Sequence, residues 1–357
     1  MIPKTLAANH LAGAQIADPT PAWSTQLREA IRDPLELCQQ LGLNPDALPG
    51  GRAGLQGADG LFKTLVPRPF LDRMQPGNST DPLLLQVLPQ GAESLQVPGF
   101  VTDPLEEARF NPLPGLIHKY TSRVLLTLSG GCAVNCRYCF RRHFPYAENS
   151  LSRPALSAVL DYLNQHPEVN EVILSGGDPL ATPDARLLEV IQQLELQPSI
   201  KRLRIHTRLP VVVPARITPA LLEGLNTSRL QTLMVMHINH PQEIDQAVSQ
   251  ALEQLKQAGV ILLNQSVLLR GVNDRAEVLA ELSEKLFTNG VLPYYLHTLD
   301  PVEGAAHFAM DASQHQTLYA DLLARLPGYL VPRLVKEEAD RPSKTPLGWP
   351  VQQEMTL

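Results

Sequence analysis

From residue 123 onward, the sequence alternates compact apolar runs with amphipathic segments, six times in succession. The runs are rich in Val, Ile and Leu and are bounded by turn residues, as expected for strands buried on both faces. The segments between them carry apolar residues at helical spacing, for example Leu156, Val159 and Leu163. This alternation predicts a parallel sheet covered by helices. The predicted strands lie in RVLLTLS (123–129), EVILSGGDPL (171–180), KRLRIHTR (201–208), QTLMVMHINH (231–240), VILLNQSVLL (260–269) and LPYYLHTLD (292–300).

Six strand–helix units without a clear seventh and eighth predict an α/β fold built as a partial (β/α)6 TIM-type barrel. An open doubly wound sheet is the competing architecture. We expect three domains: a mainly helical extension over 1–110, the barrel over 111–311, and a C-terminal helix with a following segment over 312–357. Thr182 is expected to cap the helix after the second strand, and Gly259 to close the helix after the fourth.

Polar side chains gather at the ends of the predicted strands. The carboxyl ends of parallel strands share one face of a barrel, and barrel active sites are built on that face. We therefore expect these side chains to line one site. The sets at successive strand ends are Ser175 to Asp178, His206 to Arg208, His237 to His240, Asn264 and Gln265, and His297 to Asp300.

The loop after the first predicted strand, GGCAVNCRYCFRRH (130–143), holds Cys132, Cys136 and Cys139, three of the four cysteines. Such a group is typical of a zinc site, a disulfide, a catalytic thiol or an iron–sulfur centre. Structural zinc takes four ligands, for which His143 is the available fourth residue. An ordinary ferredoxin cluster takes four cysteines, so three would leave one iron of a 4Fe–4S cluster without a protein thiolate. An open coordination position is where chemistry occurs.

The composition narrows the class of protein. Acidic residues outnumber basic ones by 36 to 30, and the net charge of -6 argues against a protein that coats nucleic acid. No apolar run approaches the roughly 18 residues of a membrane span, and residues 1–19 lack the pattern of a signal peptide. Four cysteines in 357 residues do not make a disulfide framework. We therefore expect a cytoplasmic protein without nucleic-acid or membrane partners.

The cysteine loop resembles that of the radical S-adenosylmethionine (SAM) enzymes. The spacing CxxxCxxC follows a strand, Tyr138 precedes the last cysteine, and the next strand ends in SGGDP. The resemblance implies a 4Fe–4S cluster on the three cysteines, whose unligated iron binds the amino and carboxylate groups of SAM. It also implies that a glycine turn contacts the amino group of SAM. The residues of this turn are Gly176, Gly177 and Asp178.

Residues 90 to 347 are similar to the lysine 2,3-aminomutases. Within that family, VPRPFLDRMQPGN, PGFVTDPLEE and CFRRHFPYAEN resemble the branch that serves elongation factor P. That branch isomerises (S)-α-lysine to (R)-β-lysine, which a separate ligase attaches to a lysine of elongation factor P. The resemblance implies this reaction on free L-lysine, with pyridoxal 5'-phosphate (PLP) as a further cofactor and an electron donor such as flavodoxin or ferredoxin. The similar stretches are GLIHKYTSRVLLTLSGGCAVNCRYCFRRH, RLPVVVPARIT, HINHPQEI, LLNQSVLLRGVND, PYYLHTLD, AAHF and SKTPL.

The same resemblance implies roles for single residues. Lys344, in SKTPL, is the lysine that bonds to PLP. Arg141, two residues past the third cysteine, holds the substrate carboxylate with its planar fork of donors. Asp300 and Glu337 hold the distal ammonium of lysine, and this acidic pair favours lysine over glutamate. The residues implied for the PLP phosphate or ring are Lys119, Tyr120, Arg123 and Gln265.

The chain departs from the family pattern in two places. DRPS replaces the glycine run before Lys344, and no cysteine follows Cys139, so the C-terminal zinc cysteines of some lysine aminomutases are absent. Three alternatives stay open. One is a radical SAM and PLP aminomutase that acts on free lysine for another pathway or on another amino acid. Another is a zinc-stabilised binding protein without turnover. The third, a radical enzyme that modifies RNA, is disfavoured by the acidic balance and by SKTPL.

Overall fold

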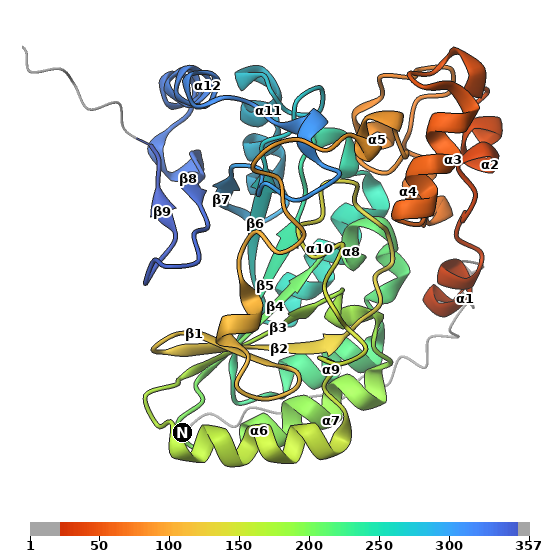
Figure 1. The fold of residues 1–357 in the computed structure, drawn as a ribbon. Coiled ribbons are helices and arrows are strands. Elements are labelled where there is room, and N and C mark those ends of the chain that lie inside the picture. Colours follow the sequence, from red (N-terminus) through yellow and green to blue (C-terminus); the bar gives the residue numbers. More distant parts are fainter. Residues whose placement is uncertain (1–21, 349–357) are drawn as a thin grey trace, which may run out of the picture.

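The computed structural model describes residues 22–348, so the residues considered for a signal peptide lie outside the described part. Within it, one sheet of nine strands runs through the molecule in sequence order (Figure 1). β2 to β8 are parallel, whereas β1 and β9 are antiparallel edge strands. The strands are β1 (Leu116–Tyr120), β2 (Arg123–Ser129), β3 (Glu171–Gly176), β4 (Arg202–Thr207), β5 (Gln231–His237), β6 (Ile261–Val267), β7 (Leu292–His297), β8 (Arg333–Lys336) and β9 (Thr345–Pro346).

The predicted α/β fold is confirmed, and β2 to β7 are the six predicted strands. Among the described residues the edge strands β1 and β9 do not pair with each other, so the barrel is partial and not closed. β2 to β7, each followed by a helix, are the six predicted strand–helix units, and β8 adds a further parallel strand that is followed by β9 and not by a helix. β8 has four residues, RLVK, and β9 has two, so neither holds an apolar run long enough to be recognised.

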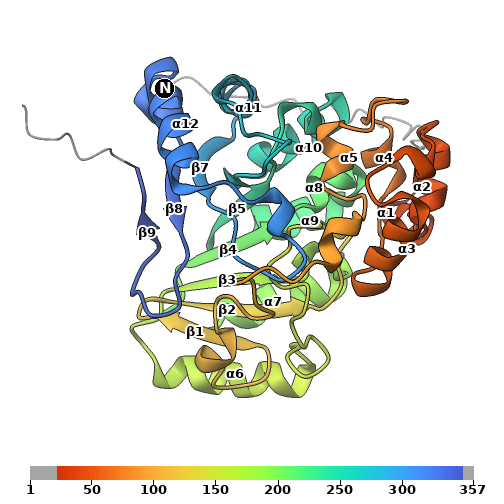
Figure 2. The same ribbon diagram turned by 45° about the horizontal axis from the view of Figure 1, so that its top comes forward.

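The helices that follow the strands lie on the outer side of the curved sheet (Figure 2). Each presents an apolar face to the strands; in the helix after β3, for example, Leu187, Val190 and Leu194 are fully buried. Between residues 22 and 348, no helix is both long and apolar enough to cross a membrane. The helices are α6 (Arg153–Gln165), α7 (Asp184–Glu195), α8 (Leu209–Val212), α9 (Pro219–Asn226), α10 (Gln246–Gln257), α11 (Ala276–Thr288) and α12 (Ala312–Arg325).

The start of α7 differs from the prediction. Pro183 occupies its N-cap position, and no side chain caps the helix. The expectation that Thr182 caps α7 was wrong, because Thr182 ends the 3₁₀ turn Pro179–Ala181 and its carbonyl accepts a hydrogen bond from Arg216 at 3.1 Å. The same Thr-Pro pattern does cap α9, where the Thr218 side chain accepts from the backbone N–H three residues on.

The helix that Gly259 was expected to close follows the predicted strand 231–240, but it begins only at Gln246. The residues before it form instead a 3₁₀ turn, Pro241–Glu243, and the Glu243 side chain is fully buried. Gly259 follows the end of α10 as predicted, with a φ of +79°, which glycine adopts without strain. The early break in the helix therefore places a carboxylate inside the protein.

The extension packs closely on the barrel, beside α8 and α10 (Figure 1). Its side chains Leu37, Phe70 and Leu83 belong to the same cluster of buried apolar residues as Leu126 and Leu174 of the barrel. The extension therefore shares a continuous core with the sheet. Its helices are α1 (Trp23–Arg28), α2 (Pro34–Gln40), α3 (Gly51–Leu61), α4 (Arg68–Leu71) and α5 (Pro82–Leu85).

Candidate active site

The carboxyl ends of the parallel strands open onto one cavity of about 450 Å³. Each strand end with a predicted polar set contributes to its lining, for example Ser175, His237 and Asp300, so the expectation of a shared face is confirmed. Gln265 also lies on this cavity. Its neighbour Asn264 is buried and hydrogen-bonds the backbone of Ile238, just after the preceding strand β5.

The loop after β2 brings Cys132, Cys136 and Cys139 to the wall of this cavity as free thiols. Burial raises the pKa of the Cys132 thiol well above its usual value, and the neighbouring Cys139 and Asp178 raise it further. Burial also raises the pKa of Cys139 to about 12, with Cys136 adding to the effect. Burial and neighbouring thiols thus oppose the ionisation of Cys132 and Cys139, which suits a ligand that brings positive charge, as iron does.

The zinc alternative fits this arrangement poorly. Between residues 22 and 348, no three His, Cys, Asp or Glu side chains are arranged to hold a single metal ion. His143 is exposed, lies 3.4 Å from the Glu303 carbonyl oxygen, and lines a separate cavity. Because His143, the fourth ligand considered for zinc, is exposed and lines the other cavity, the three thiols suit a cluster with three protein ligands better than a zinc site with four.

The glycine turn after β3 packs directly against the cysteine loop. A Cβ on Gly177 would lie 2.4 Å from the Gly131 carbonyl oxygen, and Gly176 has a φ of +112°. Only glycine suits both positions. The Asp178 N–H donates to the same Gly131 oxygen at 2.8 Å, which fixes the turn on the loop.

The Asp178 carboxylate is engaged within the protein. It accepts from the Thr207 hydroxyl at 2.7 Å and from the N–H groups of Arg208 and Leu209 at 2.7 and 3.0 Å. Burial nevertheless raises its pKa, since these hydrogen bonds offset the desolvation only in part. The side chain thus ties the turn after β3 to the end of β4, and the two glycines line the cavity.

At another part of the cavity, Lys119, Tyr120, Glu337 and Lys344 form one group, here called the Glu337 cluster. Glu337 Oε1 accepts from Lys119 Nζ at 2.7 Å and from the Tyr120 hydroxyl at 2.5 Å, while Oε2 pairs with Lys344 Nζ. Burial alone would raise the pKa of Glu337. The Lys344 charge and the hydrogen bonds from Lys119 and Tyr120 outweigh burial and lower the pKa to about 2.

The Glu337 cluster joins residues for which the sequence implied separate roles. Lys119 and Tyr120 were expected on phosphate, and Glu337 on the substrate ammonium. The Glu337 carboxylate occupies a site formed by the Lys119 amine and the Tyr120 hydroxyl. Arg123 adds a guanidinium to this site, 4.0 Å from the centre of the Tyr120 ring. Such a set of donors suits a phosphate. These residues therefore fit PLP, with the amine of Lys344 close by.

The same contacts bridge the two edges of the open sheet. Lys119 and Tyr120 end β1, whereas Glu337 follows β8, and both lysine and tyrosine reach Glu337 across the gap. Lys119 Nζ also donates to the Glu338 carbonyl at 2.5 Å. Side chains, and not a strand pairing, thus join these edges.

Arg141 is buried and holds a carboxylate with both arms of its fork. Its Nε and Nη2 donate to the two oxygens of Glu107, at 2.8 and 2.6 Å, and Nη1 donates to the Ser175 hydroxyl at 3.0 Å. Glu107, Phe140 and Arg141 line both this cavity and a second one of about 390 Å³, so the ion pair lies between the two. The sequence singled out Arg141 but not Glu107, which lies in a short 3₁₀ turn of the extension.

Asp300, just after β7, lines the cavity and is partly buried. Burial raises the pKa of its carboxyl to about 7. Lys344 lowers this pKa and the negative charges of Glu337 and Glu107 raise it. Asp300 is therefore an acid poised near neutrality beside the Glu337 cluster.

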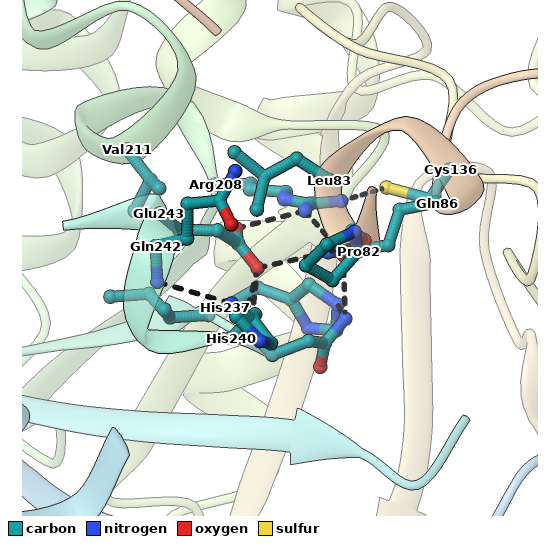
Figure 3. Close-up of polar contacts among 12 residues, drawn as sticks. Pro82, Leu83, Gln86, Cys136, Arg208, Val211, His237, His240, Gln242 and Glu243 are labelled. Carbon is teal, nitrogen blue, oxygen red and sulfur yellow. Dashed lines mark hydrogen bonds and ion pairs between the residues drawn. The ribbon is translucent and has the colours of Figure 1, made fainter. Parts of the chain in front are cut away.

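A second buried group, here called the Arg208 network, reaches Cys136 through Arg208 (Figure 3). It consists of Gln86, Tyr138, Arg208, Asn239 and Glu243, linked by hydrogen bonds. The sequence placed Arg208 at a strand end but gave no role to Gln86 or Glu243. These two come from the extension and from the turn before α10.

Residues 126–282, from β2 into α11, match the Radical SAM superfamily. Together with the cysteine-lined cavity, this match defines a radical SAM protein. The L-lysine 2,3-aminomutase of Escherichia coli (strain K12) is 52% identical over 333 residues, which cover 93% of this chain and 96% of that protein. The chain belongs to the L-lysine 2,3-aminomutase family, as the sequence predicted.

Other relatives differ in how much of their length is matched. The L-lysine 2,3-aminomutase of Haemophilus influenzae is 51% identical, over 90% of this chain and 94% of that protein. That of Clostridium subterminale is 36% identical, over 91% of this chain and 77% of that protein. Family membership makes the chain an isomerase and implies the predicted cofactors, a 4Fe–4S cluster, SAM and PLP.

Proposed function

We propose that this chain isomerises free (S)-α-lysine to (R)-β-lysine by radical 2,3-amino migration, and that the product modifies elongation factor P. The match covers 96% of the E. coli relative and 94% of the H. influenzae relative, which supports the assignment of this chain to the same branch of the family as these two proteins. The stretches VPRPFLDRMQPGN and PGFVTDPLEE support the branch that serves elongation factor P.

The observation that carries the proposal is the shared cavity. It joins the cysteine loop to Lys344 and places Arg141 and two acids on the same lining. The fork of Arg141 already binds a carboxylate side chain, so it suits the α-carboxylate of an amino acid. Asp300 and Glu337 suit a distal ammonium and repel a distal carboxylate, which favours lysine over glutamate.

The residues divide the cofactors between two parts of the cavity. In this proposal the three cysteines hold the cluster, the Gly176–Asp178 turn holds SAM, and Lys344 bonds PLP. When bound, these groups supply a carbon-centred radical and a conjugated ring over which unpaired spin spreads. Lys119, Tyr120 and Arg123 then hold the phosphate, and Gln265, which lines the same cavity, contacts the ring or the phosphate.

The protein's own groups orient the substrate. Arg141 fixes the carboxylate and Asp300 the distal ammonium, so the carbons between them have one position. Apolar walls, among them Leu105 and Val267, keep water and stray hydrogen donors from the reacting carbon. Both arms of Arg141 donate to Glu107, so the substrate carboxylate competes with Glu107 for this fork.

Anaerobic incubation of the reconstituted enzyme with L-lysine, SAM, PLP and dithionite tests the proposal. Chiral chromatography should find (R)-β-lysine, and none when SAM is omitted. (S)-β-lysine, or turnover of another amino acid in preference to lysine, would contradict it. Adding the lysine ligase and elongation factor P should then shift the mass of elongation factor P by one lysyl residue. Replacing dithionite by reduced flavodoxin or ferredoxin tests the proposed electron donors.

A further inference from the structure

Arg208 directs its buried guanidinium at the sulfur of Cys136. Nη1 donates to Cys136 Sγ at 2.8 Å (Figure 3). It also donates to the Tyr138 hydroxyl at 2.9 Å. Nη2 donates to Gln86 Oε1 at 2.6 Å and to Glu243 Oε2 at 2.9 Å. The fork is thus divided between a cysteine on one side and a carboxylate on the other.

Glu243 keeps the guanidinium in this orientation. Its Oε1 accepts from the backbone N–H groups of Asn239 and His240 at 2.9 and 3.1 Å and from Gln86 Nε2 at 3.2 Å. The Arg208 and Glu243 side chains are 6% and 0% exposed. A carboxylate with this many donors cannot turn away, so the positive end of the pair stays fixed on the sulfur.

We propose that Arg208 is a positioning residue that hydrogen-bonds the Cys136 sulfur as a cluster ligand and raises the reduction potential of the 4Fe–4S cluster, with Glu243 limiting that rise. Hydrogen bonds to the sulfurs, local charge and burial set the potentials of such clusters. Reduction adds one electron, taken from the external donor, and no proton. The reduced cluster carries one more negative charge, which a fixed cation beside its ligand stabilises.

The proposal predicts opposite effects for the two members of the pair. Arg208→Gln removes the cation. At the potential where the wild-type cluster is half reduced, the ratio of reduced to oxidised cluster in this variant should fall about tenfold. This fall is equivalent to a reduction potential lower by about 59 mV. Glu243→Gln leaves the cation uncompensated, so the same ratio should rise, by about threefold. Both variants lose the same buried ion pair, so a purely structural role would not separate them.

Potentiometric titration of the reconstituted full chain, followed by electron paramagnetic resonance, measures these ratios. SAM, PLP and lysine are left out, so the result depends on the cluster and not on which amino acid is the substrate. Arg216→Gln is the matched control: Arg216 is also fully buried but bonds Leu180, Thr182 and Asp184. It should lower thermal stability and leave the potential unchanged.

Three outcomes would overturn the proposal. Arg208→Gln and Arg216→Gln could shift the ratio equally, Arg208→Gln could leave it unchanged, or Glu243→Gln could lower it. If Arg208→Gln does not retain its cluster, Arg208→Lys decides together with Glu243→Gln. Lysine keeps the charge but offers no fork, so its ratio should fall by less than tenfold. A Glu243→Gln ratio that does not rise would then refute the role.

Discussion

The Arg208 network and the Glu337 cluster both place arginine or lysine beside a carboxylate on the same cavity, but they differ in burial and in origin. The Arg208–Glu243 pair is 6% and 0% exposed, whereas Lys344 and Glu337 are 26% and 10% exposed. The first lies between strand ends and the extension. The second spans the two edges of the sheet.

The Arg208 network is the part of the site that is already formed. The Glu337 cluster is the part whose residues must exchange hydrogen-bond partners when a cofactor binds. Tyr138, Asn239 and Gln86 satisfy one another around Arg208, so the cysteine side needs little rearrangement to accept a cluster. In the Glu337 cluster, a carboxylate holds donors that suit a phosphate. PLP must therefore take Lys119 and Tyr120 from Glu337.

The largest effect is expected on the preformed side. Cys136→Ala should abolish the cluster and all SAM cleavage, because no other thiol can replace this ligand. Iron content, visible absorption and release of 5'-deoxyadenosine check it. Cys38→Ala, in the apolar core of the extension, should keep all three. Unchanged turnover in Cys136→Ala would refute the ligand assignment.

On the exchanging side, Lys344→Ala should lose the covalent link to PLP while its iron content stays that of wild type. Activity should fall by about 10³-fold or more, because the amine that bonds the cofactor is gone. Borohydride reduction followed by peptide mapping locates the link. Lys336→Ala, a half-exposed lysine on β8, is the control. Borohydride trapping of PLP on the Lys344→Ala protein would show that another lysine bonds it.

Arg141 and Glu107 should move substrate binding in opposite directions. Arg141→Lys loses the two-armed contact, so the KM for lysine should rise about 10- to 100-fold. Glu107→Gln weakens the competitor for that fork, so KM should fall, by about threefold. Steady-state kinetics with chromatographic detection of β-lysine measures both. A rise in KM for Glu107→Gln would mean that Glu107 itself helps to bind substrate.

The smallest expected effect is a pH dependence set by Asp300. Its pKa is raised to about 7, so the carboxyl gains a proton below that pH and no longer attracts an ammonium. Lys344, Glu337, Glu107 and Lys336 are the charged groups that act on it. kcat/KM for lysine should fall about tenfold per pH unit below pH 7. Asp300→Asn should remove this limb; an unchanged profile would show that another group causes it.

The sequence predicted the parts of the molecule that depend on local pattern. Apolar runs gave β2 to β7, and polar residues at strand ends gave the face that holds the cavity. The resemblance named Arg141, Asp300 and Lys344, which the fold brings onto one cavity. Their individual roles stay predictions.

What the sequence did not reveal depends on contacts between distant segments. Glu107 meets Arg141 from 34 positions away, and Gln86 meets Arg208 across 122. Such partners are chosen by packing in three dimensions and leave no periodic signal. Glu243 was hidden for a local reason, because the 3₁₀ turn that buries it reads as the start of a helix.

The gap between β1 and β9 bears on how cofactor and substrate reach the interior. A cylinder joined all round by backbone hydrogen bonds admits large molecules only at its ends or after strands separate. Here Lys119 and Tyr120 close one side through three hydrogen bonds, two to Glu337 and one to the Glu338 carbonyl. Within the described residues, parting that side breaks side-chain contacts and leaves the strand pairings of the sheet in place. The open side of the sheet thus lies where PLP is expected to bind. The phosphate of the incoming cofactor competes with Glu337 for Lys119 and Tyr120.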